Sequence, residues 1–76
     1  MGLDNLIVMA NRIGQFFAAQ PDRAEALAGI ADHVKKFWEP RMRRQILAAL
    51  DTDEAAGLSE IVAAALRTHR AMLQPA

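Results

Sequence analysis

Residues 22–40 read DRAEALAGIADHVKKFWEP, and they contain the full pattern of one amphipathic helix. Asp22 is a favoured N-cap residue, and Glu25 follows three positions later, as in a capping box. Apolar residues then recur at helical spacing until Pro40, which disfavours helical backbone in the residue before it. Together these signals predict a helix over residues 22–38.

The segments before and after this stretch have helical patterns of their own. Apolar spacing predicts an earlier helix over residues 4–19, which stops before Pro21. Pro40 suits the first turn of a helix over residues 40–50, because the first backbone N–H groups of a helix have no partner within it. A last helix is expected over residues 59–72, after an acidic loop.

Composition and length favour one all-α domain. The chain has no Tyr and no sustained period-two alternation, whereas its sixteen Ala residues favour helix. Seventy-six residues suffice for one domain at most. We therefore expect a single domain over residues 1–76, folded as a compact bundle of three to four short helices. In this bundle the acidic loop covers residues 51–57, and Ser59 caps the last helix.

The helix expected over residues 4–19 has a broad apolar face. At 100° per residue, the following residues fall on an arc approaching half the circumference: Leu3, Leu6, Ile7, Met9, Ala10, Ile13, Gly14, Phe16 and Phe17. So wide a face predicts contacts on two sides, within the domain or with a partner. Gly14 and Gly29 each cost up to about 1 kcal/mol relative to Ala inside a helix, and we interpret both as points of close helix–helix approach.

Basic residues gather in the middle of the chain. The nine Lys and Arg residues balance nine Asp and Glu residues, but five of the basic ones lie within residues 35–44. Phe37 and Trp38 lie in the same segment, and aromatic residues and Arg are enriched at protein interfaces. Two interpretations stay open: the segment is a contact surface, or its rings fill the domain's own core and its arginines are merely solvated.

Residues suited to catalysis or metal binding are few. The chain has no Cys and two His. His69 has no acidic residue or second His one helical turn away, so we interpret it as partly buried with one hydrogen bond or as an interface residue, and His33 as a surface residue. Asp51, Asp53 and Glu54 lack the spacing of a calcium loop and are interpreted as solvated. We predict no catalytic, cofactor-binding or metal-binding residue.

Several broad classes of protein fit the sequence poorly. No apolar run approaches the length of a membrane span, and the first residues lack the pattern of a signal peptide. The expected location is therefore the cytoplasm. Zero net charge argues against nucleic-acid binding as the main role, although the basic segment keeps that alternative open. A homo-oligomer formed through the broad apolar face is a further alternative.

Two segments carry a family resemblance. The first is MANRIGQFF at residues 9–17, followed by QP at 20–21. The second is GIADHV at residues 29–34, which runs into FWEPRMR at 37–43. Together they resemble the delta subunit of soluble NAD-dependent, molybdenum-containing formate dehydrogenases, over roughly residues 3–50.

The resemblance implies a small non-catalytic protein that accompanies a large enzyme. In that family the larger subunits oxidise formate to carbon dioxide and pass the electrons to NAD. Those subunits hold molybdopterin guanine dinucleotide, iron–sulfur clusters and FMN. The small member is associated with assembly or stability of the complex, so the expected partners are the larger formate dehydrogenase subunits. Self-association remains open for the chain alone.

The resemblance also implies that the matching residues mark a contact surface. The expected partner-binding residues are Asn11, Gln15, Lys36, Phe37, Trp38, Arg41, Arg43 and Arg44. Basic residues of this kind steer and orient an acidic partner. We expect reversal of Arg41, Arg43 and Arg44 to Glu to leave the domain helical and to abolish partner capture.

Overall fold

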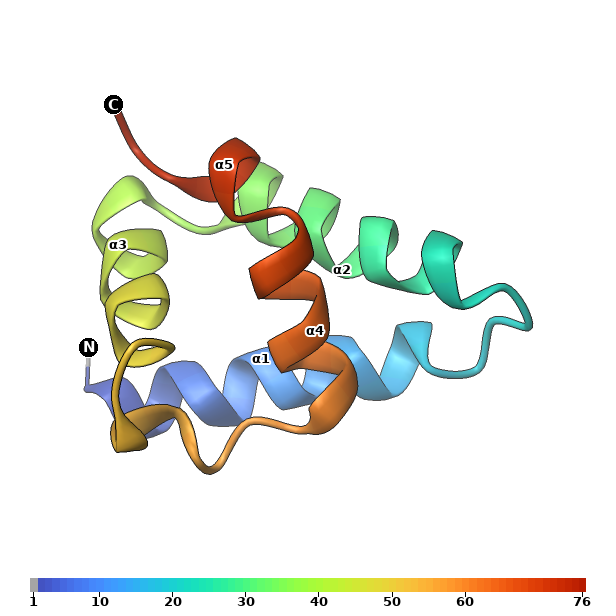
Figure 1. Ribbon diagram of the computed structural model, residues 1–76, viewed down its shortest axis with the longest axis horizontal. Coiled ribbons are helices and arrows are strands. Elements are labelled where there is room, and N and C mark those ends of the chain that lie inside the picture. Colours follow the sequence, from blue (N-terminus) through green and yellow to red (C-terminus); the bar gives the residue numbers. More distant parts are fainter. Residues whose placement is uncertain (1) are drawn as a thin grey trace.

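The computed structural model describes residues 2–76, which fold into five α-helices and one short 3-10 helix (Figure 1). The elements are α1 (Leu3–Phe17), α2 (Arg23–Phe37), α3 (Pro40–Ala49), η1 (Asp53–Ala55), α4 (Glu60–Thr68) and α5 (Arg70–Leu73). No strand occurs within these residues, so the predicted all-α fold is confirmed. The count of helices differs from the prediction, because the segment expected as one last helix forms two.

The first two helices form a hairpin that the other helices cover on one face. α1 and α2 run side by side and are joined by residues 18–22, and α4 crosses both of them (Figure 1). α3 packs on α1 at the other end of the hairpin, and α5 returns to α2. α1 therefore contacts α2, α3 and α4, which confirms that its broad apolar face serves more than one neighbour.

The signals predicted at the two ends of α2 are present. The Asp22 side chain accepts a hydrogen bond from the Glu25 N–H at 3.2 Å, so Asp22 caps the helix. Pro40 occupies the first turn of α3, and the preceding Glu39 has extended backbone, as proline requires of the residue before it. α2 therefore ends at Phe37, and α3 begins three residues later.

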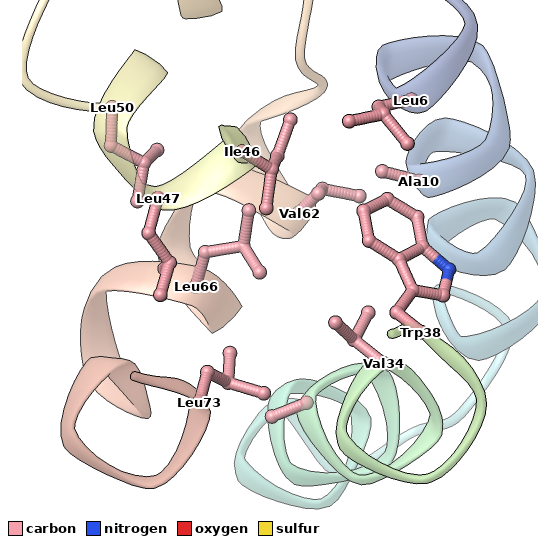
Figure 2. Packing of buried hydrophobic residues seen from close by; sticks show 11 residues of the cluster. Leu6, Ala10, Val34, Trp38, Ile46, Leu47, Leu50, Val62, Leu66 and Leu73 are labelled. Carbon is pink, nitrogen blue, oxygen red and sulfur yellow. The ribbon is translucent and has the colours of Figure 1, made fainter. Parts of the chain in front are cut away.

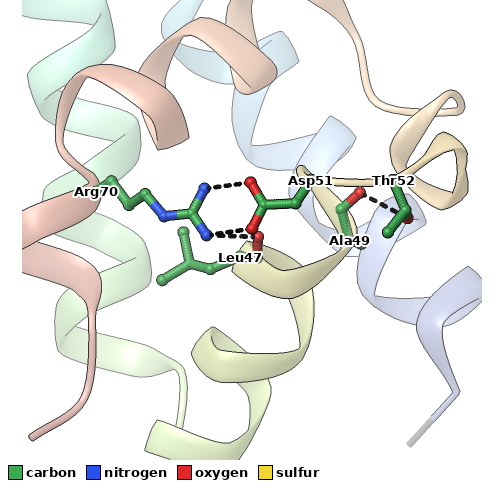
Figure 3. Close-up of polar contacts among 5 residues, drawn as sticks. All are labelled: Leu47, Ala49, Asp51, Thr52 and Arg70. Carbon is green, nitrogen blue, oxygen red and sulfur yellow. Dashed lines mark hydrogen bonds and ion pairs between the residues drawn. The ribbon is translucent and has the colours of Figure 1, made fainter.

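The last helix was predicted as one continuous element, and this prediction is wrong. The backbone breaks at His69, where φ is −107° and ψ is 23°. The break lets Arg70 donate hydrogen bonds to both carboxylate oxygens of Asp51 and to the Leu47 carbonyl (Figure 3). It also buries Leu73 against the core. These tertiary contacts compensate for the lost helical hydrogen bonding.

Ser59 precedes α4 in extended conformation, but its side chain makes no capping hydrogen bond. A side chain of α1 instead forms hydrogen bonds with the backbone at this N-cap position and two residues before it. The Ser59 N–H donates to the Asn11 Oδ1 at 2.8 Å, and the Asn11 Nδ2 donates to the Gly57 carbonyl at 3.0 Å. One side chain of α1 thus holds the loop that leads into α4.

The core lies where the helices meet. Figure 2 shows Trp38 beside Ala10 of α1 on one side of the core, with Leu47, Leu50 and Leu73 on the opposite side. The buried cluster consists of Leu6, Ala10, Ala31, Val34, Trp38, Ile46, Leu47, Leu50, Val62, Leu66 and Leu73. Every element except η1 contributes to this cluster, and α5 contributes the single residue Leu73.

Both interior glycines lie at close helix–helix contacts, as predicted. A Cβ atom at Gly14 would lie 2.5 Å from the Val62 Cγ2, and one at Gly29 would lie 2.5 Å from the Phe17 ring. Real Cβ atoms do not approach other heavy atoms so closely. Gly14 therefore lets α1 approach α4, and Gly29 lets the end of α1 lie against α2.

Candidate protein-protein interface

The segment that joins α2 to α3 is divided between interior and surface. Trp38 is 5% exposed and belongs to the core, whereas the neighbouring Phe37 is 70% exposed. The open question about the two rings therefore has a different answer for each. Trp38 is not accessible to a partner in this conformation, and Phe37 is.

Arg43 lies in the interior, although it was expected at the contact surface. It is 8% exposed, and its guanidinium donates three hydrogen bonds to backbone carbonyls. Nε donates to the Leu73 carbonyl at 3.0 Å, and Nη1 donates to the Trp38 carbonyl at 2.9 Å and the Lys35 carbonyl at 3.3 Å. Arg43 thereby joins the end of α2 to the end of α5, and it is omitted from the candidate interface.

Three of the predicted basic residues remain on the surface. Arg41 and Arg44 are exposed and lie three positions apart, so they share one face of α3. Lys36 is also exposed, and its Nζ lies 3.0 Å from the Asp32 carboxylate one turn earlier. Such exposed pairs contribute about 0.3–0.5 kcal/mol, so Lys36 is easily released to another carboxylate.

The two polar residues expected from α1 have different surroundings. Asn11 is half-buried, and both ends of its amide are occupied by the loop before α4. Gln15 is exposed on the same helix. Asn11 therefore has a structural role in this conformation, and Gln15 is free to contact a partner.

An aromatic groove, which was not predicted from the sequence, lies between α1 and α2. Ile13, Phe16, Phe17 and His33 line a shallow cavity of about 330 Å³. The His33 ring is 4.7 Å from the Phe37 ring, centroid to centroid, which extends the aromatic surface along α2. We call these five residues the aromatic groove. Phe16 is 74% exposed, and no other large apolar side chain of residues 2–76 is more exposed.

Two signals in the sequence bear on the aromatic groove. Phe16 lies at the edge of the broad apolar face of α1, and His33 lies four residues before Phe37 on one face of α2. Neither signal shows that the two faces adjoin, because that depends on how the helices of the hairpin align. The groove could therefore be recognised only from the tertiary structure.

A second shallow cavity, of about 310 Å³, lies between α2 and the α4–α5 break. Ala28, Gly29, Asp32, His69 and Met72 line it. His69 is half-buried there, which agrees with its interpretation as a partly buried residue. No group of three or more His, Asp or Glu side chains within residues 2–76 is placed to hold a metal ion.

The fold and the surface of residues 2–76 together describe a small helical domain whose most exposed large apolar side chains are aromatic. Such a surface is typical of a protein that binds other proteins. The family model of FdsD, the NADH-dependent formate dehydrogenase delta subunit, matches residues 5–66. The chain belongs to this family. No curated protein and no solved structure matches it. Within residues 2–76, no helix has the length and apolar character needed to cross a membrane.

Proposed function

We propose that this chain is a non-catalytic accessory subunit of a cytoplasmic NAD-dependent molybdenum formate dehydrogenase. It binds the larger subunits and supports their assembly or stability. The observation that carries the proposal is the match of the delta-subunit family to residues 5–66.

The surface of the domain supports a binding role. Phe16 and Phe37 expose most of their rings, and aromatic residues supply much of the binding energy at protein interfaces. Lys36, Arg41 and Arg44 add exposed positive charge near the α2–α3 corner. Charges of this kind accelerate association with an acidic surface and orient it.

The chemistry of the complex is assigned to the partners. We place molybdopterin guanine dinucleotide, the iron–sulfur clusters, FMN and the NAD site in the larger subunits. This chain has no Cys to ligate a cluster. Its contribution is therefore buried area and orientation, not a chemical step.

The test is a pull-down with the tagged full chain in extract of its native cells, followed by mass spectrometry of the bound proteins. The informative variant carries Arg41→Glu and Arg44→Glu. Arg43 is left intact, because a carboxylate there would face three carbonyl oxygens and disturb the fold. A control variant with Lys35→Glu and Arg67→Glu makes the same change in net charge at other exposed positions, neither of which forms an ion pair within residues 2–76.

We expect the wild-type chain and the control to capture the larger formate dehydrogenase subunits and the Arg41/Arg44 variant to lose them. If every variant still captures the larger subunits, the proposed partner is supported, and Arg41 and Arg44 are not part of the interface. Recovery of the chain alone would favour the homo-oligomer. Recovery of nucleic acid that declines steeply with salt would favour the nucleic-acid alternative.

A further inference from the structure

The aromatic groove is an accessible apolar surface of α1 and α2 with an exposed cation beside it. On the basis of the proposed function, we infer that it receives a large apolar side chain from a larger formate dehydrogenase subunit. A carboxylate within one helical turn of that side chain binds Arg12. The groove is thus the anchor point of this chain on its partner.

The rings of the groove form one continuous surface. Phe16 and Phe17 pack edge to face at 5.1 Å between centroids, and the Phe17 ring lies over Gly29 of α2. Phe17 and His33 line the same cavity, and His33 in turn contacts Phe37. Apolar contact is therefore available from the end of α1 to the end of α2.

The size of the cavity fits a side chain. A cavity of about 150 Å³ accommodates a benzene ring. The groove, at about 330 Å³, has room for one large apolar side chain and part of the backbone that carries it. Because Phe16 and Phe37 flank the groove and are mostly exposed, an inserted side chain would cover both.

Charge indicates what accompanies the apolar side chain. Arg12 lies one helical turn before Phe16 and is exposed, so it borders the α1 side of the groove. Of the three ion pairs within residues 2–76, none involves Arg12. On the α2 side, Lys36 already pairs with Asp32. The groove therefore offers an unpaired cation, which a carboxylate of the partner would complement.

The area of the groove argues against a second copy of this chain. A Phe side chain buries about 150–250 Å², so two rings that are 74% and 70% exposed offer roughly 300 Å². A stable dimer needs about 800 Å² from each partner. Val8 and Met72, the other exposed large apolar residues within residues 2–76, line neither the cavity nor its aromatic extension. A larger subunit that surrounds the domain would supply the remaining area through polar contacts.

The first test measures binding to formate dehydrogenase purified from cells that lack this chain. The purified full chain is added back, and affinity is measured by surface plasmon resonance. We expect Phe16→Gln combined with Phe37→Gln to weaken binding by about 30-fold or more, and Arg12→Glu to weaken it by about tenfold. Val8→Gln combined with Met72→Gln, and separately Arg67→Glu, are controls at exposed positions outside the groove and are expected to bind as wild type.

The second test identifies the occupant. The photoreactive residue p-benzoylphenylalanine replaces Phe16, which keeps an aromatic ring at that position, and replaces Val8 in the control. After irradiation of the complex, mass spectrometry of the cross-linked peptides locates the contact. We expect position 16 to cross-link to an apolar residue of a larger subunit that has Asp or Glu within about four positions.

The outcomes separate this inference from the proposed function. Failure of the wild-type chain to bind the enzyme overturns both. Binding that is unaffected by the groove variants overturns this inference alone. Cross-links from position 16 to a second copy, or to a segment without a carboxylate, also overturn it.

Discussion

Arg43 is a cation in the interior of the domain, and three carbonyl oxygens hold it there. Removing a guanidinium from water is costly, but charge-assisted hydrogen bonds offset the cost. Their acceptors are Lys35 and Trp38 at the end of α2 and Leu73 at the end of α5. The side chain therefore links segments that are distant in the sequence.

Removal of this side chain tests its structural role. We expect Arg43→Ala to lower the free energy of unfolding by about 3 kcal/mol, because buried carbonyls lose their partners. Urea unfolding followed by circular dichroism measures the change. Arg44→Ala, at an exposed position in the same helix, is expected to stay within about 0.5 kcal/mol of wild type. Similar small losses in both variants would contradict the role assigned to Arg43.

Asn11 provides a second test at the scale of one residue. Its amide makes two hydrogen bonds to the loop before α4, so we expect Asn11→Ala to cost about 1–2 kcal/mol and to increase hydrogen exchange at the Ser59 amide. Gln15→Ala is the matched control, because Gln15 lies one turn further along α1 and is exposed. Equal hydrogen exchange at the Ser59 amide in the two variants would contradict the role of Asn11 in holding the loop before α4.

At the scale of helices, the contact between α1 and α4 depends on the absence of a side chain. We expect Gly14→Ala to destabilise the fold by about 1–2 kcal/mol, because overpacking against Val62 outweighs the gain in helix propensity. Thermal unfolding measures this change. Val62→Ala removes the obstructing methyl groups, so the double variant is expected to lose less stability than the two single losses combined. If the loss of stability in the double variant equals the sum of the two single losses, there is no steric conflict between positions 14 and 62.

Local signals in the sequence sufficed for much of the helical architecture. Asp22 and Pro40 marked the beginning of α2 and of α3 because capping and proline geometry act within a few residues. The break at His69 had no such signal, because no glycine or proline is nearby. It depends on the tertiary contacts of Arg70 and Leu73.

The candidate site was less predictable than the helices. Basic residues usually lie at the surface, and this tendency held for Arg41 but not for Arg43, whose partners come from α2 and α5. The aromatic groove was missed because it combines Phe16 and His33 from two helices. A pattern within one helix does not reveal which residues of the next helix lie beside it.

At the scale of the whole molecule, the exposed large apolar residues found within residues 2–76 are too few for strong self-association. We expect sedimentation equilibrium to give the mass of one 8.3 kDa chain at micromolar concentrations. A mass that rises with concentration would favour the homo-oligomer. If Phe16→Gln combined with Phe37→Gln then abolished the rise, the groove would be the surface responsible.

The burial of Trp38 also provides an optical reporter. The sequence has one Trp and no Tyr, so near-ultraviolet fluorescence comes almost entirely from one indole ring. Because this ring is 5% exposed, dissolved quenchers reach it poorly, and unfolding moves its emission to longer wavelength. Loss of the fold is therefore detectable by fluorescence without an added label.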